Sequence, residues 1–510
     1  MSDVFASALK KEFDNDTVLT ENGAVMYKTS GKKLVDINFA VSSLRQKSDG
    51  EVIKMFSEAY YENKEYAVRW LFMLRDVRGG LGERKSFRTC FKWLAGVDAD
   101  AVKKLVPVVA EYGRFDDLYV LFGTQAEDVV FDYIDSQLSS DYEMKRAGKP
   151  VSLLAKWLPS CNASSPATKA LAKKIYRRLD LSERQYRKTL SELRAYIDVT
   201  EVKASANKWS EIDYEKVPSM ANLRYRKAFL KNDKERREEY IKKLSSGEAK
   251  INAATCFPSD IAYGYLKNSD GWHTSFSEDA VLEGMWKALP QISGEKNIIT
   301  VVDTSSSMSW EKCDPKSGIR PLDVAFALGV YCSEHLTGPF KDKCITFNDN
   351  PSYIDFSGQT RLFEKLNTLS RSDIGGSTNI EAVMDLLLKT AVDNNVKQED
   401  IPEIVILSDM EFNCGCRSTC GYDGDKTALF NEIADMYKAA GYKLPKIFYW
   451  NLNSRSNGIP IQTNELGVGL VSGYSQNTVK MLLSGRLDPW EILKEQLDTE
   501  RYAKVTEILK

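Results

Sequence analysis

Residues 297–310, NIITVVDTSSSMSW, decide how the second half of this chain folds. The first six of them form a short β-branched run of the kind that makes a buried strand, and a polar loop follows directly. Four similar runs come later in the chain, at residues 343–347, 403–408, 446–452 and 467–472. Helical patterns lie between the runs, at residues 323–336, 379–392 and 428–441. This alternation predicts a mainly parallel sheet with right-handed crossovers and helices on both faces.

Short oxygen-bearing side chains follow three of these runs. Asp303, Ser305 and Ser307 come after the first run, Thr378 lies in the segment GGSTN before a helix, and Asp409 follows the run at 403–408. The carboxyl ends of parallel strands share one edge, where α/β sheets bind ligands. Hydroxyls with only two carboxylates suit Mg²⁺, or Mn²⁺ or Ca²⁺, and leave the ion a position for an acidic ligand group. The alternative is a metal-free sheet edge capped by polar residues.

The order DxSxS, then GGST, then SD closely resembles the von Willebrand factor A domain and its metal-ion-dependent adhesion site (MIDAS). The resemblance covers about residues 295–485. It implies a doubly wound, Rossmann-like domain in which Asp303, Ser305 and Ser307 supply the first metal loop. It further implies Thr378 in the second loop, with Ser377 as a substitute, and Asp409 in the third.

The first half of the chain reads as mostly helical between residues 48 and 266, with short turn signals between the helices. This pattern predicts an irregular, solenoid-like stack of helical hairpins without a fixed repeat, similar to HEAT repeats. Residues 24–40 allow either a small hairpin or a helix. We therefore expect an α plus α/β protein with a helical domain over 1–290 and the α/β domain over 291–510, closed by helices within 489–509.

Helices followed by a von Willebrand A domain resemble the Ro ribonucleoproteins, whose helical part is the TROVE domain. Four segments resemble an uncharacterised family of this architecture in viruses, phages and plants: RDVRGGLGERKSFR (75–88), EYGRFDDL (111–118), KWLPS (156–160) and VSGYS (471–475). The Ro resemblance implies that the helical domain binds small or misfolded RNA. Both a ring-shaped and an open helical domain are compatible with the sequence.

Charge is balanced over the whole chain, with a net charge of -2, so bulk charge selects no partner. Residues 151–250, however, hold 23 Lys and Arg against 13 Asp and Glu. In the runs 173–194 and 224–243 the cations alternate with Tyr176, Tyr186, Tyr225 and Phe229, as single-stranded RNA binding requires. The candidate RNA-binding residues are Arg75, Arg78, Arg84, Lys85, Arg177, Arg178, Arg187, Lys188, Arg224 and Arg226.

Each group of candidate RNA-binding residues has a structural alternative. The long basic runs are also typical of a solvated helix face with Glu and Lys pairs. The turn at 75–88 is also compatible with a buried structural turn, in which Arg75 or Arg78 pairs with Asp76, Glu83 or the acidic segment 111–117.

Nine cysteines in a chain of 510 residues are too few for a secreted disulfide scaffold, and reduced thiols are expected. Cys313, Cys414, Cys416 and Cys420 predict either a structural zinc site or a loop of free or oxidisable thiols. Only two histidines occur, which disfavours a His-rich metal centre.

Together these features predict a cytoplasmic, monomeric scaffold that binds RNA through its helical half and an acidic protein partner through its metal site. The alternative is a protein-interaction module without an RNA role. An enzyme is not expected, because the site lacks a second carboxylate set and a general base. No apolar run is long enough to span a membrane.

Overall fold

The computed structural model describes residues 17–267, 275–292, 294, 296–314, 317–372, 374–414, 429–461, 467–483 and 486–510. The chain divides into two compact units. Unit 1 comprises Met1–Ala67 and Cys256–Asp498, and unit 2 comprises Val68–Thr255 and Thr499–Lys510. The chain therefore passes between the units three times, whereas the sequence predicted one boundary, between residues 290 and 291.

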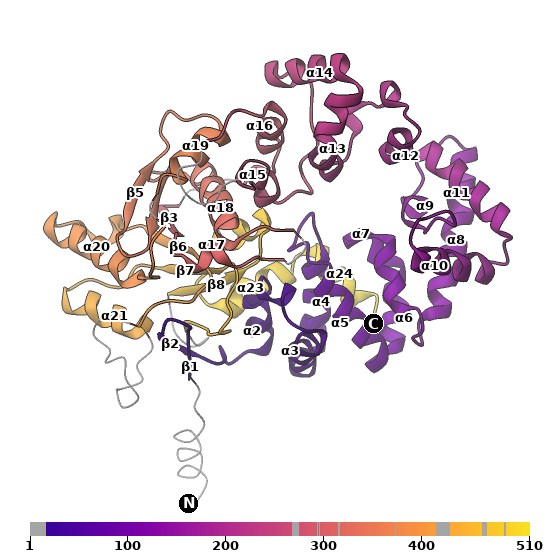
Figure 1. Ribbon diagram of the computed structural model, residues 1–510. Coiled ribbons are helices and arrows are strands. Elements are labelled where there is room, and N and C mark those ends of the chain that lie inside the picture. Colours follow the sequence, from indigo (N-terminus) through magenta and orange to yellow (C-terminus); the bar gives the residue numbers. More distant parts are fainter. Residues whose placement is uncertain are drawn as a thin grey trace, which may run out of the picture. The chain divides into compact units, whose positions relative to one another are not determined.

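Unit 1 is built on a six-stranded sheet of order β5-β4-β3-β6-β7-β8, in which β5 alone runs antiparallel to its neighbour (Figure 1). Every residue of β3 is buried, as expected for a central strand covered on both faces. The strands are β3 (Ile298–Asp303), β4 (Lys343–Phe347), β5 (Ser352–Asp355), β6 (Glu403–Ser408), β7 (Ile447–Asn451) and β8 (Val468–Ser472).

Helices cover both faces of this sheet. Helix α18 packs on β3 and β6 and contacts α15 and α19, whereas α20 packs with α21 on the other face (Figure 1). The remaining helices of unit 1 contact the sheet edge or one another. The α-helices of the unit are α2 (Lys33–Phe39), α3 (Asp49–Glu62), α15 (Pro258–Leu266), α16 (Ala280–Lys287), α17 (Ser307–Trp310), α18 (Pro321–His335), α19 (Leu362–Leu369), α20 (Ile380–Asp393), α21 (Leu429–Ala439), α22 (Val479–Leu483) and α23 (Pro489–Leu497).

Side-chain bonds explain why helices predicted for the helical domain belong to unit 1. The carboxylate of Glu283, in α16, accepts the backbone N–H groups of Leu362 and Phe363 at 2.8 and 3.1 Å and so caps the first turn of α19. The sequence pattern shows that residues 256–290 are helical but cannot show which neighbour they pack against.

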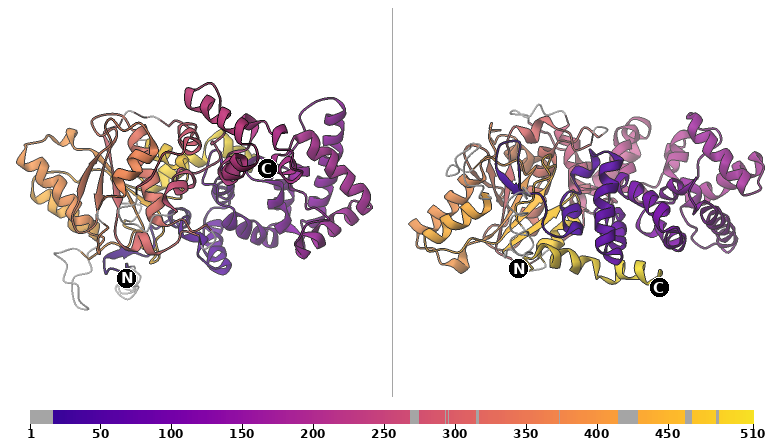
Figure 2. Two further views of the ribbon diagram at one scale, coloured as in Figure 1. Left: turned by 45° about the horizontal axis from the view of Figure 1, so that its top comes forward. Right: turned by 90° about the horizontal axis from the view of Figure 1, so that it is seen from below.

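Unit 2 consists of helices, seen from two further sides in Figure 2. Helix α4 (Lys64–Arg75) begins in unit 1 and ends in unit 2. Ser165 and Ser182 cap α10 and α11 by accepting backbone N–H groups, which explains where these helices begin. The other α-helices of unit 2 are α5 (Lys85–Val97), α6 (Ala99–Leu105), α7 (Val109–Tyr112), α8 (Glu127–Arg146), α9 (Leu154–Trp157), α10 (Pro166–Arg178), α11 (Glu183–Ile197), α12 (Thr200–Ser205), α13 (Ser219–Asn232), α14 (Lys234–Ser246) and α24 (Glu500–Glu507).

The predicted combination of a helical part with a parallel-rich α/β part is confirmed. All five predicted strands occur, within a residue or two of their expected bounds. The sequence missed β5, a four-residue edge strand with mostly exposed side chains. Residues 24–40 contain a strand, β2 (Val25–Tyr27), which pairs with β1 (Thr17–Leu19), and then helix α2.

Candidate metal site and cationic surface

The predicted metal residues gather where the sheet topology reverses. From β3 the chain continues to β4 on one side, and from the adjacent β6 it continues to β7 on the other. Asp303 is the last residue of β3 and Asp409 follows β6, so both carboxylates lie at the same edge, and both are fully buried. Ligands of α/β sheets bind at this kind of position.

Hydroxyl groups surround the two carboxylates. The Asp303 carboxylate accepts the N–H of Ser305 at 2.9 Å and the hydroxyl of Ser408 at 2.5 Å. The hydroxyl oxygens of Ser305 and Ser307 are 3.1 Å apart, and the Ser307 hydroxyl lies close enough to Asp409 to oppose the rise in its pKa. One short loop thus joins both carboxylates through its serines.

The second predicted loop is held beside the first by backbone bonds. Ser306 donates to the carbonyl of Gly375 at 2.8 Å, and Gly375 donates back to the carbonyl of Thr304 at 3.2 Å. A Cβ at position 375 would lie 2.5 Å from the Cβ of Asn348, so this approach requires glycine. Thr378, which is buried, follows this turn.

Ser377 differs from Thr378 in its partner. Its hydroxyl donates to the carboxylate of Asp349, while the Thr378 hydroxyl oxygen accepts a bond from the Asn22 side chain at 3.4 Å. The structure therefore favours Thr378 over Ser377 as the residue of the second loop.

The two buried carboxylates are short of positive charge. Burial and the neighbouring Asp409 raise the pKa of Asp303, and burial raises the pKa of Asp409, against the opposing effect of Arg455. Among the described residues, Oδ2 of Asp409 has no hydrogen-bond partner, although the Arg455 guanidinium lies 3.3 Å away. A divalent cation would relieve both penalties, so the residues present fit a metal ion. Among the described residues, no group of three or more His, Cys, Asp or Glu side chains is placed to hold a metal ion. The site at Asp303 has two carboxylates, and its other predicted ligands are hydroxyls.

The four cysteines considered as zinc ligands are only partly described. Cys313 is a buried free thiol, and burial raises its pKa to about 12, which favours the thiol over the thiolate that binds metal. Cys414 is disulfide-bonded. Cys416 and Cys420 lie outside the described residues. The zinc site stays a prediction.

The first arginine of the segment 75–88, at the end of α4, forms a buried ion pair. Arg75 is buried and bonds to the buried carboxylate of Asp117 at 2.7 Å, and Arg88 bonds to the same carboxylate at 2.6 Å. A Cβ at Gly80 would lie 2.1 Å from the carbonyl oxygen of Met73, so the chain folds tightly back on the helix. The expectation that Arg75 binds RNA is therefore wrong, and the alternative of a buried structural turn describes it correctly.

Some cations and aromatic rings of the basic runs, predicted to bind RNA, contact other parts of unit 2 instead. Arg178 pairs with Asp128 and lies 5.1 Å from the ring of Phe131, and these contacts hold α10 against α8. Tyr186 and Phe229, expected to stack on bases, are buried in the core. Their apolar faces are consumed by packing and are not available to RNA.

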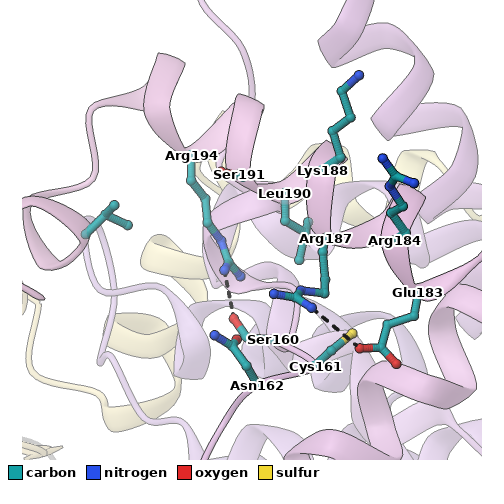
Figure 3. A pocket seen from close by; sticks show the side chains of 11 residues that line it. Ser160, Cys161, Asn162, Glu183, Arg184, Arg187, Lys188, Leu190, Ser191 and Arg194 are labelled. Atoms are coloured by element: carbon teal, nitrogen blue, oxygen red, sulfur yellow. Dashed lines mark hydrogen bonds and ion pairs between the residues drawn. The ribbon is translucent and has the colours of Figure 1, made fainter. Parts of the chain in front are cut away.

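Cations remain exposed on α11 (Figure 3). Arg184, Arg187 and Lys188 line a cavity of about 720 Å³ together with Arg194, opposite the loop that holds Ser160. The Arg194 side chain is held in place, because its guanidinium donates to Ser160 Oγ and to the carbonyls of residues 155 and 158 at 2.6–2.8 Å. The remaining predicted cations lie elsewhere: Arg78, Arg84, Lys85, Arg177 and Arg224 are exposed and Arg226 is half-buried.

The acidic side chains near this cavity neutralise it only in part. Arg187 lies 4.0 Å from Glu183 and Lys188 lies 3.9 Å from Glu192, both as exposed pairs within one helix. Such pairs are weak and screened by salt. The cavity surface therefore keeps an excess of positive charge.

Family models match both halves of the chain. A domain of unknown function, DUF2828, matches residues 20–110 and 126–293, which is more than half of the chain. The chain belongs to this family. A second domain of unknown function, DUF7788, matches residues 297–507.

Two individual proteins are similar to this one over most of its length. Uncharacterized protein L728 of Acanthamoeba polyphaga mimivirus is 29% identical over 94% of this chain and 87% of its own. The crystal structure of the Ro (RSR) protein of Deinococcus radiodurans covers 92% of both chains at 12% identity, with a TM-score of 0.36. That score is too low to assign a function. Among the described helices, none has the length and apolar character to cross a membrane.

Several residues at the metal edge had no signal in the sequence. Two of them are Arg455, which follows β7, and Glu411, which follows β6. Both contact the turn between β1 and β2, through Glu21 and Asn22. Glu411 is fully buried and accepts the backbone N–H groups of Arg455 and Glu21 at 2.7 and 2.9 Å. The contacts of Glu21 and Asn22 with Glu411 join segments about 390 positions apart, and no local motif marks either partner.

Proposed function

We propose that this protein is a binding scaffold whose unit 1 holds a divalent cation and recruits an acidic ligand through it. The observation that carries this proposal is the pair of fully buried carboxylates, Asp303 and Asp409, facing hydroxyls at the carboxyl edge of the sheet. The residues that would hold the ion are Asp303, Ser305, Ser307, Thr378 and Asp409. When bound, Mg²⁺ supplies an electrophilic position that takes a carboxylate oxygen of the ligand.

Binding suits this site better than turnover. Two carboxylates and three hydroxyls provide one cation position, and the described residues add no further acidic or histidine cluster for a second metal or a general base. An exposed tryptophan, Trp310, lies three residues beyond Ser307 with 82% of its surface accessible. Exposed tryptophans are frequent anchors of protein partners, so we propose a protein as the ligand.

Isothermal titration of the full chain with MgCl₂ tests the metal site. We expect one Mg²⁺ per chain and a loss of affinity of at least about a hundredfold for Asp303→Asn, because a direct ligand should matter at least as much as an outer partner. Asp393→Asn, which removes an exposed carboxylate at the end of α20, is the matched control and should bind like the wild type. Equal Mg²⁺ affinity in all three proteins would contradict the proposal.

We further propose that unit 2 binds single-stranded RNA on the α11 surface. This second candidate rests on the cavity lined by Arg184, Arg187, Lys188 and Arg194, whose positive charge the nearby acids neutralise only in part. Arginine and lysine side chains at such a surface neutralise phosphates. Tyr186 and Phe229 are buried and cannot stack on a base, so the proposed contact is made through phosphates and not through these rings.

Fluorescence anisotropy with a labelled single-stranded RNA distinguishes these alternatives. Replacing Arg184, Arg187 and Lys188 with Glu should weaken binding and reduce the slope of log affinity against log salt by about 2, from about 0.7 per lost phosphate contact. The control exchanges three exposed lysines of unit 1, Lys389, Lys397 and Lys480, for Glu. If both triple variants bind RNA equally, α11 is a solvated face and this surface does not bind RNA. If the wild type binds no RNA, the protein-interaction alternative is favoured.

A further inference from the structure

The turn between β1 and β2, residues 20–24, covers the metal edge of unit 1. The side chain of Asn22 donates to the carbonyl of Glu411 at 2.6 Å and to the hydroxyl of Thr378 at 3.4 Å. The backbone of the turn continues this contact, because Cys414 donates its N–H to the carbonyl of Asn22 at 3.2 Å. A proposed metal ligand is thereby in contact with a segment from the other end of the chain.

Arg455 links this turn to the buried carboxylates. Its Nη2 lies 2.8 Å from Glu21 Oε2 and 3.3 Å from Asp409 Oδ2, so one nitrogen serves two acids. The other two nitrogens, Nε and Nη1, are buried and have no hydrogen-bond partner among the described residues. A guanidinium can hold a carboxylate through two parallel bonds, and this one uses a single nitrogen.

The two acids on Arg455 differ in how firmly they are held. The side chain of Asp409 is fully buried, whereas that of Glu21 is 55% exposed. Exposed ion pairs contribute little and exchange readily with other partners. Glu21 can therefore leave Arg455 without disturbing the core, while Asp409 cannot.

We infer that Glu21 is an internal stand-in for the ligand, and that Arg455 is the second anchor for the ligand's carboxylate beside the cation. This inference rests on the proposed metal site and adds that the Arg455 guanidinium binds the carboxylate of the ligand. An acidic side chain of a protein partner replaces Glu21 on Arg455, takes up the unused guanidinium donors and reaches the cation position at Thr378. The N-terminal turn then leaves the site, so the resting protein holds its partner more weakly than a protein without Glu21 does.

Glu21→Gln in the full chain tests this inference, with a fluorescein-labelled hexaglutamate peptide as the probe at saturating Mg²⁺. We expect Glu21→Gln to bind the peptide about tenfold more tightly than the wild type, since removal of an internal competitor raises the competent fraction. Arg455→Gln, alone or combined with Glu21→Gln, should bind it at least about tenfold more weakly. Glu399→Gln, an exposed glutamate of unit 1, is the matched control.

A second measurement follows the turn itself. The N–H of Glu21 is bonded to the Glu411 carboxylate at 2.9 Å, and its hydrogen exchange should accelerate when the peptide binds to the wild type. Unchanged exchange on peptide binding, or equal affinity of wild type and Glu21→Gln, would overturn the inference. So would a failure of Glu21→Gln to bind the peptide while titration shows Mg²⁺ bound. If Mg²⁺ itself does not bind, the proposed metal site fails instead.

Discussion

Asp303 ends a strand whose residues are all buried, and its environment replaces water with hydroxyls and one other carboxylate. Two carboxylates cannot both ionise there without a counter-charge, because desolvation and mutual repulsion favour the protonated form. The charge state of these two side chains thus depends on whether a cation is present. This dependence makes the site testable without knowledge of the ligand.

The pH dependence follows from the raised pKa of Asp303, which is about 7 in the folded chain. A raised carboxyl pKa contributes stability that is present below the unfolded pKa and is lost as pH rises through the folded value. Mg²⁺ requires the ionised form, so its affinity should increase between about pH 5 and about pH 7.5. Titration calorimetry at both values checks this, with Asp393→Asn as the control that should show the same increase as the wild type. Equal Mg²⁺ affinity at the two pH values would contradict the assignment.

At the scale of single elements, the basic run at 224–243 shows how an arginine can stabilise a helix pair. Arg237, in α14, is fully buried, and its guanidinium lies 4.6, 5.1 and 5.0 Å from the rings of Tyr214, Phe229 and Tyr240. These rings belong to the small hydrophobic cluster around α13 and α14. The sequence of this run suggests an RNA-binding surface, but at Arg237 it forms part of the core of unit 2.

Arg237→Leu should lower the free energy of unfolding of unit 2 by about 2 kcal/mol, because three desolvated cation–π contacts are lost. Thermal denaturation of the full chain measures the change. Lys231→Ala, an exposed cation of α13, is the control and should leave the midpoint in place. An unchanged midpoint in Arg237→Leu would show that the ring contacts contribute nothing.

The sequence predicted those elements whose signal is local. The parallel strands were predicted correctly, because β-branched runs mark them directly. Asp303 and Asp409 lie at one sheet edge, as expected from the short polar loops, whereas the metal-binding role of Asp303, Ser305, Ser307, Thr378 and Asp409 stays a prediction. Strand β5 was missed since four mostly exposed residues carry no hydrophobic period. The Glu21–Arg455 contact was missed for another reason, since a salt bridge between distant segments leaves no pattern in either.

At the scale of the whole chain, three passages connect the two units, and the last of them places α24 in unit 2. Asp76, which is fully buried, bonds to Arg501 Nε at 2.5 Å and to the Tyr502 hydroxyl at 3.1 Å. Tyr112 in turn donates to the carbonyl of Arg501 at 2.5 Å. Unit 2 thus depends on the final helix of the chain.

Arg501→Ala should destabilise unit 2 by about 3 kcal/mol, because the variant leaves the buried Asp76 carboxylate without its cation. Differential scanning calorimetry measures the loss, and Mg²⁺ titration of the same variant should match the wild type, since the metal residues belong to unit 1. Lys504→Ala, which removes an exposed pair with Glu111, is the control. Loss of Mg²⁺ binding in Arg501→Ala would show that the units do not fold independently.

The position of Arg501 also governs how this protein can mature on the ribosome. Asp76 is synthesised 425 residues before Arg501, so its carboxylate lacks this arginine until residue 501 has been made. Domains generally fold as units as they emerge, but this helical unit lacks α24 until residues 500–507 have been made. A nascent chain that stops before residue 499 therefore keeps the Asp76 carboxylate without its bonds to Arg501 and Tyr502. The residues that pack against α24 also stay uncovered. Chains that stop before residue 499 should therefore be bound by chaperones and degraded by proteases faster than chains that contain α24.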